Sequence, residues 1–402
     1  MNENKVSGKS FAEFFAGIGL MRIGLEQAGW KIVFANDIDE DKQRMYCDHF
    51  GDSREFILGD IHKLEPADIP DIALATASFP CNDLSLAGAR KGLEGSQSSA
   101  FWGFVDILKK MESRRRPPLV LLENVTGFLT SNEGEDFEDA LLALNRLGYA
   151  VDTFIVDAVH FVPQSRQRLF VIGQKTEAVT GLNDSPKFYE SEVRPAALAD
   201  FILWHPEINW RIRQLPPLPV LNRRLDDILE NLSPNSQMWW SRERCDYLLN
   251  QMSPKHRATA DKMIAGKQTT YGTVFRRVRK NKSMAELRTD GIAGCLRTPR
   301  GGSGRQILFA AGKGRFAVRL LTPRECSRLM GADDFILNVP LNQALFGFGD
   351  AVCVPVIEWI ATNYLNPVWE EEFAPAPKPY ELAPTVNYVL HDRPRRVKST
   401  KT

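Results

Sequence analysis

The sequence predicts an α/β fold with a doubly wound sheet, followed by a smaller and less regular region. Over the first 175 residues, short apolar runs alternate with amphipathic segments, which is typical of buried parallel strands covered by helices. From about Thr176 onward, prolines, a pair of tryptophans and long polar stretches replace this alternation. The length of 402 residues also fits two or three domains.

Each expected element rests on the spacing of its apolar residues. Continuous apolar runs bounded by glycine or polar residues predict strands, here over residues 9–16, 31–35, 72–79, 119–125 and 169–173. Apolar positions three or four residues apart predict helices, here near residues 20–28, 135–147, 322–330 and 354–363. The segment after Asn366 is rich in proline and charge and is expected to lack fixed structure.

The composition is that of an ordinary globular protein, with 43% hydrophobic and 25% charged residues. No apolar run reaches the roughly 18 residues that a membrane-spanning helix needs, and the first residues lack the features of a secretory signal. The six cysteines are widely spaced, with no C-x-x-C pair and no Cys/His cluster of metal-ligand spacing. We therefore expect a cytoplasmic protein with reduced thiols, no metal and no membrane partner.

A glycine-containing turn follows the first expected strand, in the sequence F-A-G-I-G at residues 15–19. Glycines let the backbone approach a ligand closely, and the start of the next helix offers free N–H groups. A dinucleotide-binding fingerprint would need a third glycine where Arg22 stands, so the pattern disfavours NAD. On its own it fits a cofactor turn and a simple tight turn equally well.

Two further turns, each with an aspartate, are expected at the same edge of the sheet as the glycine-containing turn. Asp37 comes about twenty residues after the glycines, where a carboxylate accepts hydrogen bonds from a ribose, and Ile38 is suited to pack on an adenine ring. Asp60 supplies a third turn. Any one of these aspartates is more often a helix cap or turn former. Together the three turns predict a nucleoside cofactor.

Cys81 is the candidate nucleophile among the six cysteines. It directly follows an apolar strand and Pro80, which places it on a loop at the carboxyl edge of the sheet. A helix beginning after this loop would lower the pKa of its thiol.

Glu123 ends a buried strand in the sequence E-N-V. A buried carboxyl is hydrogen-bonded or has a raised pKa, so Glu123 is either a structural carboxylate or a catalytic acid held partly protonated. Arg166 and Arg168, in the sequence Q-S-R-Q-R, precede the last strand. Strand alternation sends both to one side, where they either flank an oxygen-rich ligand or face solvent.

In this order and spacing, the motifs resemble those of the C5-cytosine DNA methyltransferases. The resemblance resumes at R-L-L-T-P-R-E-C, residues 319–326, and ends at G-F-G-D-A-V, residues 347–352, so it spans about residues 10–363 outside a variable stretch. It implies a doubly wound S-adenosylmethionine-dependent methyltransferase domain with a smaller, irregular target-recognition domain. Four positions depart from the family's usual residues, because Asn82, Cys295, Asp350 and Ala351 stand where Gln, Thr, Asn and Ser are common.

The resemblance also implies a role for each motif. Cys81 matches the thiolate that adds to C6 of a flipped-out cytosine, so that C5 can take a methyl group from S-adenosylmethionine. Glu123 matches the residue that contacts N3 of the ring. Arg168 matches the arginine at the cytosine O2, with Arg166 supporting it, and Asn124 helps shape the pocket. The matching cofactor residues are Phe15, Gly17, Gly19, Asp37, Ile38, Asp60, Pro80 and Asp350.

The resemblance divides the chain into a catalytic domain at 1–175, a target-recognition domain at 176–316, C-terminal helices at 317–365 and a flexible tail at 366–402. Residues 262–305 carry 11 basic and two acidic residues, a net charge of +9, although the whole chain has a net charge of only +1. Such a stretch favours phosphate contacts. The expected DNA contacts are Ser85, Arg276, Arg277, Arg297, Arg300, Ser303 and Arg305.

The expected activity is that of a monomeric DNA (cytosine-5-)-methyltransferase acting on double-stranded DNA. It would be the modification half of a restriction–modification system, whose endonuclease need not contact it. One alternative is a relative that methylates cytosine in tRNA, and the long variable region and basic glycine-rich loop favour DNA over it. Another is a catalytically silent DNA-binding homologue, against which the presence of every catalytic residue argues.

Overall fold

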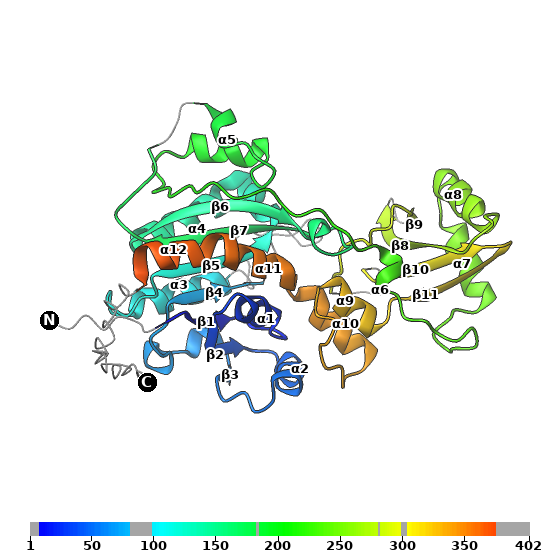
Figure 1. Ribbon diagram of the computed structural model, residues 1–402, viewed down its shortest axis with the longest axis horizontal. Helices are drawn as coiled ribbons and strands as arrows, with labels where there is room; N and C mark the ends of the chain where they lie inside the picture. The colour runs from blue at the N-terminus through cyan, green and yellow to red at the C-terminus, as the bar shows by residue number, and fades with distance from the viewer. Residues whose placement is uncertain (1–7, 81–98, 182–184, 280–281, 299–303, 375–402) are drawn as a thin grey trace, which may run out of the picture.

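The computed structural model describes residues 8–80, 99–181, 185–279, 282–298 and 304–374. Cys81, Ser85, Arg300 and Ser303, which the sequence singled out, lie outside this described part. Figure 1 shows two lobes, a larger one built on a seven-stranded sheet and a smaller one built on a four-stranded sheet.

The large sheet has the strand order β3-β2-β1-β4-β5-β7-β6. Its strands are β1 (Ser10–Phe14), β2 (Lys31–Asp37), β3 (Phe56–Leu58), β4 (Leu74–Ala77), β5 (Leu119–Val125), β6 (Tyr149–Asp157) and β7 (Gln167–Lys175). Every predicted strand is present, but β3 and β6 were not predicted. β3 is only three residues long, and the polar residues Asp152 and Thr153 interrupt the apolar run of β6. Both are fully buried, with Asp152 paired to Arg194 at 2.8 Å.

The expectation that all strands run parallel is wrong for β7, which is antiparallel to both of its neighbours, β5 and β6. The connection from Asp157 to Gln167 is shorter than the dozen or so residues that a parallel crossover needs, so the chain turns back on itself. The start of β7 consequently lies beside the carboxyl end of β5, with Arg168 opposite Val125. This reversal brings the arginine motif to the edge where the other motifs lie.

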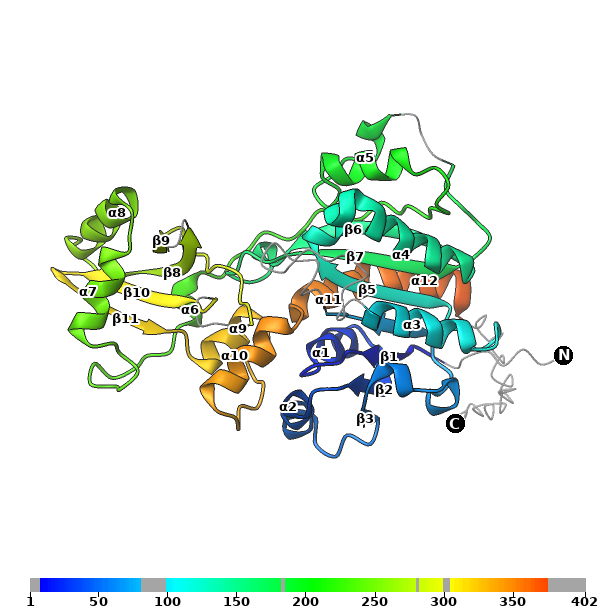
Figure 2. The same ribbon diagram turned by 180° about the vertical axis from the view of Figure 1, so that it is seen from behind.

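Helices cover both faces of the large sheet, which confirms the doubly wound α/β architecture (Figures 1 and 2). One hydrophobic core includes residues of α1 (Leu20–Gln27), α2 (Glu40–Phe50) and α11 (Val354–Ile360). A second core, on the face seen in Figure 2, includes residues of α3 (Ser99–Lys110) and α4 (Glu135–Arg146), together with α5 (Ala196–Trp204).

The C-terminal part of the chain returns to the large lobe through α9 (Pro323–Leu329), α10 (Leu341–Asp350) and α11. The helical stretch Leu341–Phe373 is long and apolar enough to cross a membrane by composition alone, but 67% of its most apolar window is buried inside the protein. Packing against the large sheet accounts for its apolar character.

The expectation of a flexible tail from residue 366 is wrong for its first nine residues. The chain stays helical through α12 (Asn366–Val368) and the following turn Trp369–Phe373. Trp369 is 4% exposed and lies 5.9 Å from the ring of Trp30, while the Trp30 indole donates a hydrogen bond to Asn366. These aromatic contacts hold a segment whose proline and charge content suggested disorder.

The small lobe is more regular than the irregular domain expected. Its four antiparallel strands have the order β11-β10-β8-β9. They are β8 (Thr270–Arg279), β9 (Lys282–Arg288), β10 (Ile307–Gly312) and β11 (Arg315–Leu320), packed with α7 (Arg242–Asn250) and α8 (Pro254–Ile264). Part of the basic stretch thus forms the paired strands β8 and β9, because buried Val274 and Ala285 anchor strands whose many charges concealed their pattern.

The segment between the two sheets packs on the large lobe. Val193, Trp210 and Ile228 belong to the cores of the large lobe, whereas the core of the small lobe contains residues from Cys245 to Val318. The small helix α6 (Leu225–Ile228) lies at the junction of the lobes (Figure 1).

Candidate active site

The first part of the site is the turn after β1, which lies beside the end of β2. The Gly17 N–H donates a hydrogen bond of 2.7 Å to Oδ2 of Asp37, and Oδ1 of Asp37 accepts one from the Asp39 N–H at 3.0 Å. Phe15, Gly17 and Gly19 all have positive φ, so the chain reverses sharply here. The predicted residues Phe15, Gly17 and Asp37 are therefore brought together at one edge.

The two glycines of this turn have different roles. A Cβ on Gly17 would make ordinary van der Waals contact with the Lys42 Cδ and the Phe15 carbonyl oxygen, both at 4.0 Å. A Cβ on Gly19 would come within 2.4 Å of the Phe50 ring and 2.8 Å of the Tyr46 ring. Gly19 is thus required by the packing of α2 against the turn, whereas glycine is favoured at position 17 by its positive φ.

The other residues predicted to bind the cofactor lie after β2, β3 and β4, at the same edge of the sheet as the turn after β1. We call this the cofactor edge. Some of these residues are exposed and one caps a turn. Ile38 is 68% exposed just after β2, which leaves it free to cover a flat ring. Asp60 accepts a hydrogen bond of 3.0 Å from the His62 N–H and caps the turn Ile61–Lys63. Pro80 is exposed at the end of the described segment after β4. A glycine-containing turn, a buried carboxylate and an exposed apolar side chain together fit a nucleoside.

A buried acid beneath the turn was not predicted. Glu13 on β1 is 3% exposed, and burial raises the pKa of its carboxyl well above the ordinary value, although the nearby Arg22 opposes this shift. Arg22 donates hydrogen bonds to the Tyr46 hydroxyl and to Glu55. No sequence signal distinguishes Glu13, because its surroundings come from α1, α2 and the segment before β3.

The second part of the site is the ion pair between Glu123 on β5 and Arg168 on β7. The Arg168 Nε lies 2.9 Å from Oε1 of Glu123, whose side chain is 8% exposed. Next along β5, Asn124 donates a hydrogen bond of 3.4 Å to the Phe79 carbonyl. Asn124 therefore fixes the strand end that continues through Pro80 to Cys81, which itself lies outside the described residues.

Arg166 has a different environment from Arg168. Its guanidinium, 2% exposed, donates hydrogen bonds to the carbonyls of Leu296 at 2.8 Å and Ala351 at 2.5 Å. It also contacts the carbonyl of Gly349 at 3.3 Å. Arg166 does not face solvent, which was one of the two alternatives left open by the sequence, because backbone carbonyls of two later segments surround it. Its role in supporting Arg168 stays a prediction.

The described cysteines differ in how easily they ionise. Burial raises the pKa of Cys47, Cys245 and Cys326, and raises that of Cys353 to about 12. Cys295 is the exception among the described cysteines: burial opposes its ionisation, but nearby arginines outweigh burial and lower its pKa. Its Sγ lies 3.4 Å from Nη1 of Arg166. The sequence singled out Cys295 only because it stands where the related family commonly has Thr.

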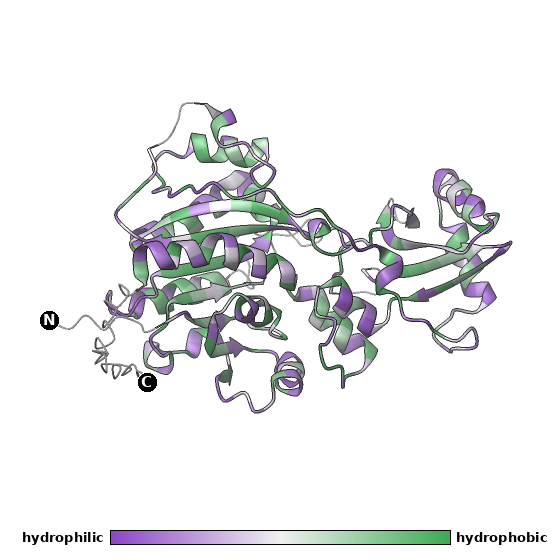
Figure 3. Cartoon of the chain, viewed as in Figure 1, coloured by the Kyte–Doolittle hydropathy of each residue, from purple (hydrophilic) through white to green (hydrophobic). Residues whose placement is uncertain are grey.

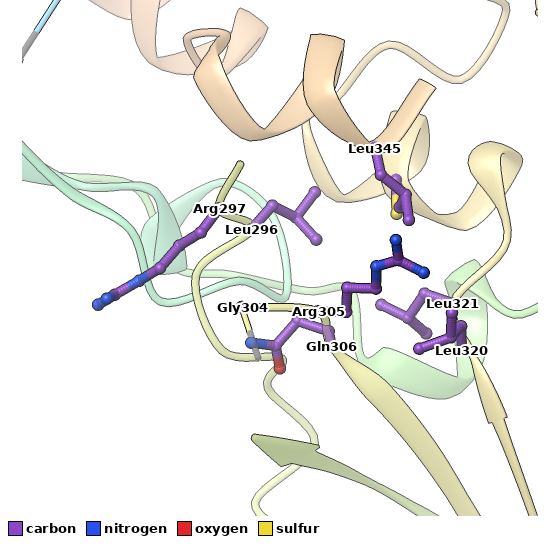
Figure 4. Close-up of a pocket in the computed structure, with 9 residues that line it drawn as sticks. Leu296, Arg297, Gly304, Arg305, Gln306, Leu320, Leu321 and Leu345 are labelled. Atoms are coloured by element: carbon purple, nitrogen blue, oxygen red, sulfur yellow. The ribbon is translucent and has the colours of Figure 1, made fainter. Parts of the chain in front are cut away.

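The small lobe gathers arginines around two aromatic rings. The guanidinium carbons of Arg277 and Arg297 lie 5.4 and 5.6 Å from the centre of the Phe275 ring. Arg277 also pairs with Glu286 at 3.4 Å. Figure 4 shows Arg297 pointing away from a small pocket at the base of the lobe. This cluster contains two of the predicted DNA contacts, whereas Arg276, next to Arg277 on β8, points to the opposite face of the strand.

Arg244 on α7 lies near Arg276 and was not predicted, because it is outside the basic stretch. Its guanidinium carbon lies 3.7 Å from the centre of the Trp240 ring. Burial lowers the pKa of Arg244, and the positive charges of Arg276 and Arg305 lower it further. Arg305 itself turns toward the large lobe and donates a hydrogen bond of 2.8 Å to Asn342 on α10.

Comparisons with known proteins agree with this geometry. A model of the family described as C-5 cytosine-specific DNA methylase matches residues 9–366. The type II methyltransferase M.HaeII of Haemophilus aegyptius is 36% identical over 359 residues, covering 88% of this chain and 92% of that protein. The type II methyltransferase M.HhaI of Haemophilus parahaemolyticus is 27% identical over 368 residues, covering 90% and 96%.

Solved structures show the same fold. The S. pombe Dnmt2 methyltransferase aligns with a TM-score of 0.57 at 19% identity, covering 90% of this chain and 99% of that one. A putative DNA modification methyltransferase of an E. coli prophage aligns with a TM-score of 0.53 at 18% identity, covering 89% and 99%. With a family model that covers nearly all of the two lobes, the chain belongs to the C-5 cytosine-specific DNA methylase family, whose members use S-adenosylmethionine.

Proposed function

We propose that this chain methylates C5 of a cytosine in duplex DNA, with Cys81 as nucleophile and S-adenosylmethionine as methyl donor. The observation that carries the proposal is the Glu123–Arg168 ion pair, beside the strand end that Asn124 fixes and that continues to Cys81. A carboxyl and a guanidinium at adjoining ends of β5 and β7 can recognise one edge of a base.

The target base leaves the stack because C5 and C6 are out of reach inside a duplex. The Cys81 thiolate forms a bond to C6, and the electron pair of the C5–C6 double bond moves to make C5 nucleophilic. Glu123 holds a proton at N3, and Arg168 holds Glu123 and the O2 atom. S-adenosylmethionine, when bound, supplies the methyl group. Loss of the C5 proton to water and departure of the Cys81 thiolate restore the aromatic ring.

The proposed cofactor site lies at the ends of β1, β2 and β4. Its direct contacts are the backbone turn at Phe15 and Gly17, the carboxylate of Asp37 and the exposed side chain of Ile38. Pro80 closes it from β4. Three further residues, Gly19, Asp60 and Asp350, shape it through their packing and capping contacts.

The proposed DNA-reading unit is the small lobe, within the predicted domain 176–316. Its aromatic-backed arginines suit phosphates and guanine edges. The proposed contacts in the described part are Arg244, Arg276, Arg277, Arg297 and Arg305. Ser85, Arg300 and Ser303 remain proposed contacts outside it. The relatives named type II methyltransferases support a role in protecting DNA from a cognate endonuclease. The proposal also includes a cytoplasmic location and a monomeric state.

The test is methyl transfer from S-adenosylmethionine with a labelled methyl group to unmethylated plasmid DNA, with the product read by bisulfite sequencing. We expect 5-methylcytosine within one sequence context. Cys81→Ser should abolish transfer while duplex binding persists, because the thiolate is lost and the small lobe is untouched. Cys47→Ser, on α2, is the matched control and should keep transfer.

Two outcomes would redirect the proposal. Label found in tRNA and not in DNA would favour the tRNA alternative, and retained transfer by Cys81→Ser would exclude the covalent route. A duplex containing 5-fluorocytosine should instead trap the wild-type chain covalently in the presence of S-adenosylmethionine, since the fluorine at C5 cannot leave as a proton does.

A further inference from the structure

Asp350, the last residue of α10, joins two parts of the molecule that the proposed function assigns to different ligands. Its Oδ2 lies 3.0 Å from Nζ of Lys42 on α2, and its Oδ1 accepts a hydrogen bond from the Thr298 hydroxyl. Lys42 follows the end of β2 on the cofactor edge, and Thr298 belongs to the basic stretch. We call Lys42, Asp350 and Thr298 the clasp.

Other contacts fix α10 in the same two directions. Toward the cofactor edge, Gln343 donates a hydrogen bond of 3.1 Å to the Asp41 carbonyl of α2. Toward the basic stretch, Asn342 accepts the hydrogen bond from Arg305 at 2.8 Å. A Cβ on Gly349 would come within 2.6 Å of the Thr298 backbone nitrogen, so the two backbones touch. The helix α10 is therefore a rigid connection between α2 and the basic stretch.

Lys42 lies directly over the turn that the cofactor would contact. Its Cδ is 4.0 Å from the position of a Cβ on Gly17, the residue whose N–H binds Asp37. Burial lowers the pKa of Lys42, but Asp350 and Asp37 outweigh burial and raise it. A charged ligand bound at this edge, such as S-adenosylmethionine, would lie close to the Lys42–Asp350 pair.

We propose that the clasp couples occupancy of the cofactor edge to duplex binding by the basic stretch, with Asp350 as a positioning residue. This inference rests on the proposed function. A charged ligand beside Lys42 changes how strongly Lys42 holds Asp350, and this changes how Asp350 holds Thr298. Coupling between two binding sites is reciprocal, so the duplex must alter cofactor affinity by the same factor.

The experiment uses the full chain and measures how each ligand changes the affinity for the other. The dissociation constant of S-adenosylhomocysteine is determined with and without unmethylated plasmid DNA, and that of the DNA with and without S-adenosylhomocysteine. For each ligand, the ratio compares its dissociation constant without and with the other ligand. For the wild type we expect the two ratios to agree, at about 5-fold or more. Asp350→Asn, Lys42→Met and Thr298→Val should each reduce the ratio by about 3-fold, the scale of one partly exposed ion pair. The double variant Lys42→Met/Asp350→Asn should lose no more than either single variant.

The control is Asp71→Asn, on the large lobe. The Asp71 side chain is 46% exposed and pairs with Arg115 at 2.8 Å, close to the 44% exposure and 3.0 Å pair of Asp350. It should keep the wild-type ratio.

Three results separate the possible failures. If Asp350→Asn weakens S-adenosylhomocysteine equally with and without DNA, Asp350 contacts the cofactor directly and the coupling role is wrong. If the wild-type ratio is 1 while methyl transfer proceeds, the clasp is overturned and the proposed function stands. If the wild type transfers no methyl group to DNA, the proposed function itself has failed.

Discussion

Arg166 and Arg168 are two positions apart, yet their surroundings give them different roles. Carbonyl oxygens of residues 296, 349 and 351 accept hydrogen bonds from the two terminal nitrogens of Arg166, whereas its buried Nε has no partner among the described residues. Arg168 instead pairs with Glu123 at the end of β5. A guanidinium that binds carbonyls from several directions has a structural role, whereas one that pairs with a carboxylate at a strand end can also bind a substrate.

Substituting each arginine by lysine separates these roles. Arg166→Lys should lower the free energy of unfolding by about 2–4 kcal/mol, because one ammonium group cannot reach all the buried carbonyls and leaves some unpaired. Arg168→Lys should leave unfolding within about 1 kcal/mol of wild type but reduce kcat, since a lysine cannot hold Glu123 and a base together. Urea denaturation and single-turnover methyl transfer measure the two effects. Equal loss of stability in both variants would contradict this division.

Glu13 predicts a specific dependence of stability on pH. Because its folded pKa is raised above its unfolded pKa, the folded state binds the extra proton, and stability falls as pH rises through the interval between the two values. The slope for this one group is at most about 1.4 kcal/mol per pH unit. Glu13→Gln should remove this contribution and unfold at higher urea than wild type at pH 7. Glu65→Gln, at an exposed site paired with Lys110, is the control and should keep the wild-type slope.

At the residue scale, the sequence predicts groups that belong to contiguous motifs. The carboxyl of Glu123, the guanidinium of Arg168 and the turn at Gly17 were all recognisable from their neighbours in the chain. Arg244, Lys42 and Glu13 were not, because each acquires its role from side chains on other elements. Thr298 meets Asp350 across 52 positions, and no local pattern encodes such a contact.

At the scale of elements, apolar runs predicted strands well where the strand is buried on both faces. They failed for β6, because the buried polar residues Asp152 and Thr153 have their partners on a distant segment. Strand direction was also beyond the pattern, since an apolar run does not state which way it runs. The short connection between β6 and β7 indicates that β7 runs antiparallel to β6. This could be used only once β6 had been recognised as a strand.

The packing of α1 against α11 depends on one glycine in the middle of a helix. A Cβ on Gly24 would lie 2.7 Å from the Ile357 Cβ and 2.7 Å from the Val354 carbonyl oxygen. We expect Gly24→Ala to destabilise the fold by about 1–3 kcal/mol despite the better helix propensity of alanine, because the helices must move apart. The measurement is the urea midpoint. Gly59→Ala, where a Cβ meets nothing within 4 Å, should stay close to wild type, and a stabilised Gly24→Ala would refute this packing argument.

For the whole molecule, the net charge of +1 conceals a difference in charge between the basic stretch and the rest of the chain. Figure 3 shows apolar strands at the centre of each lobe, so each has its own core. The basic stretch of net charge +9 lies largely in the small lobe, and the rest of the chain carries −8. We expect the DNA backbone to bind mainly to the basic stretch, because its positive charge attracts phosphates more strongly than the mildly acidic remainder of the chain does.

This separation of charge predicts how duplex binding depends on salt. Each phosphate that an arginine neutralises releases counterions, so log Kd should rise linearly with log salt, with a slope near 0.9 per phosphate contact. Arg276→Gln and Arg297→Gln should each reduce that slope by about 1 if the residue contacts phosphate, and should leave the slope unchanged while altering sequence preference if it reads a base. Arg114→Gln, 78% exposed on the large lobe and paired with Glu112, should change neither quantity. Fluorescence anisotropy with a labelled duplex over a salt series measures all of these slopes. A flat dependence for the wild type, or an equal loss in Arg114→Gln, would remove the small lobe from the DNA interface.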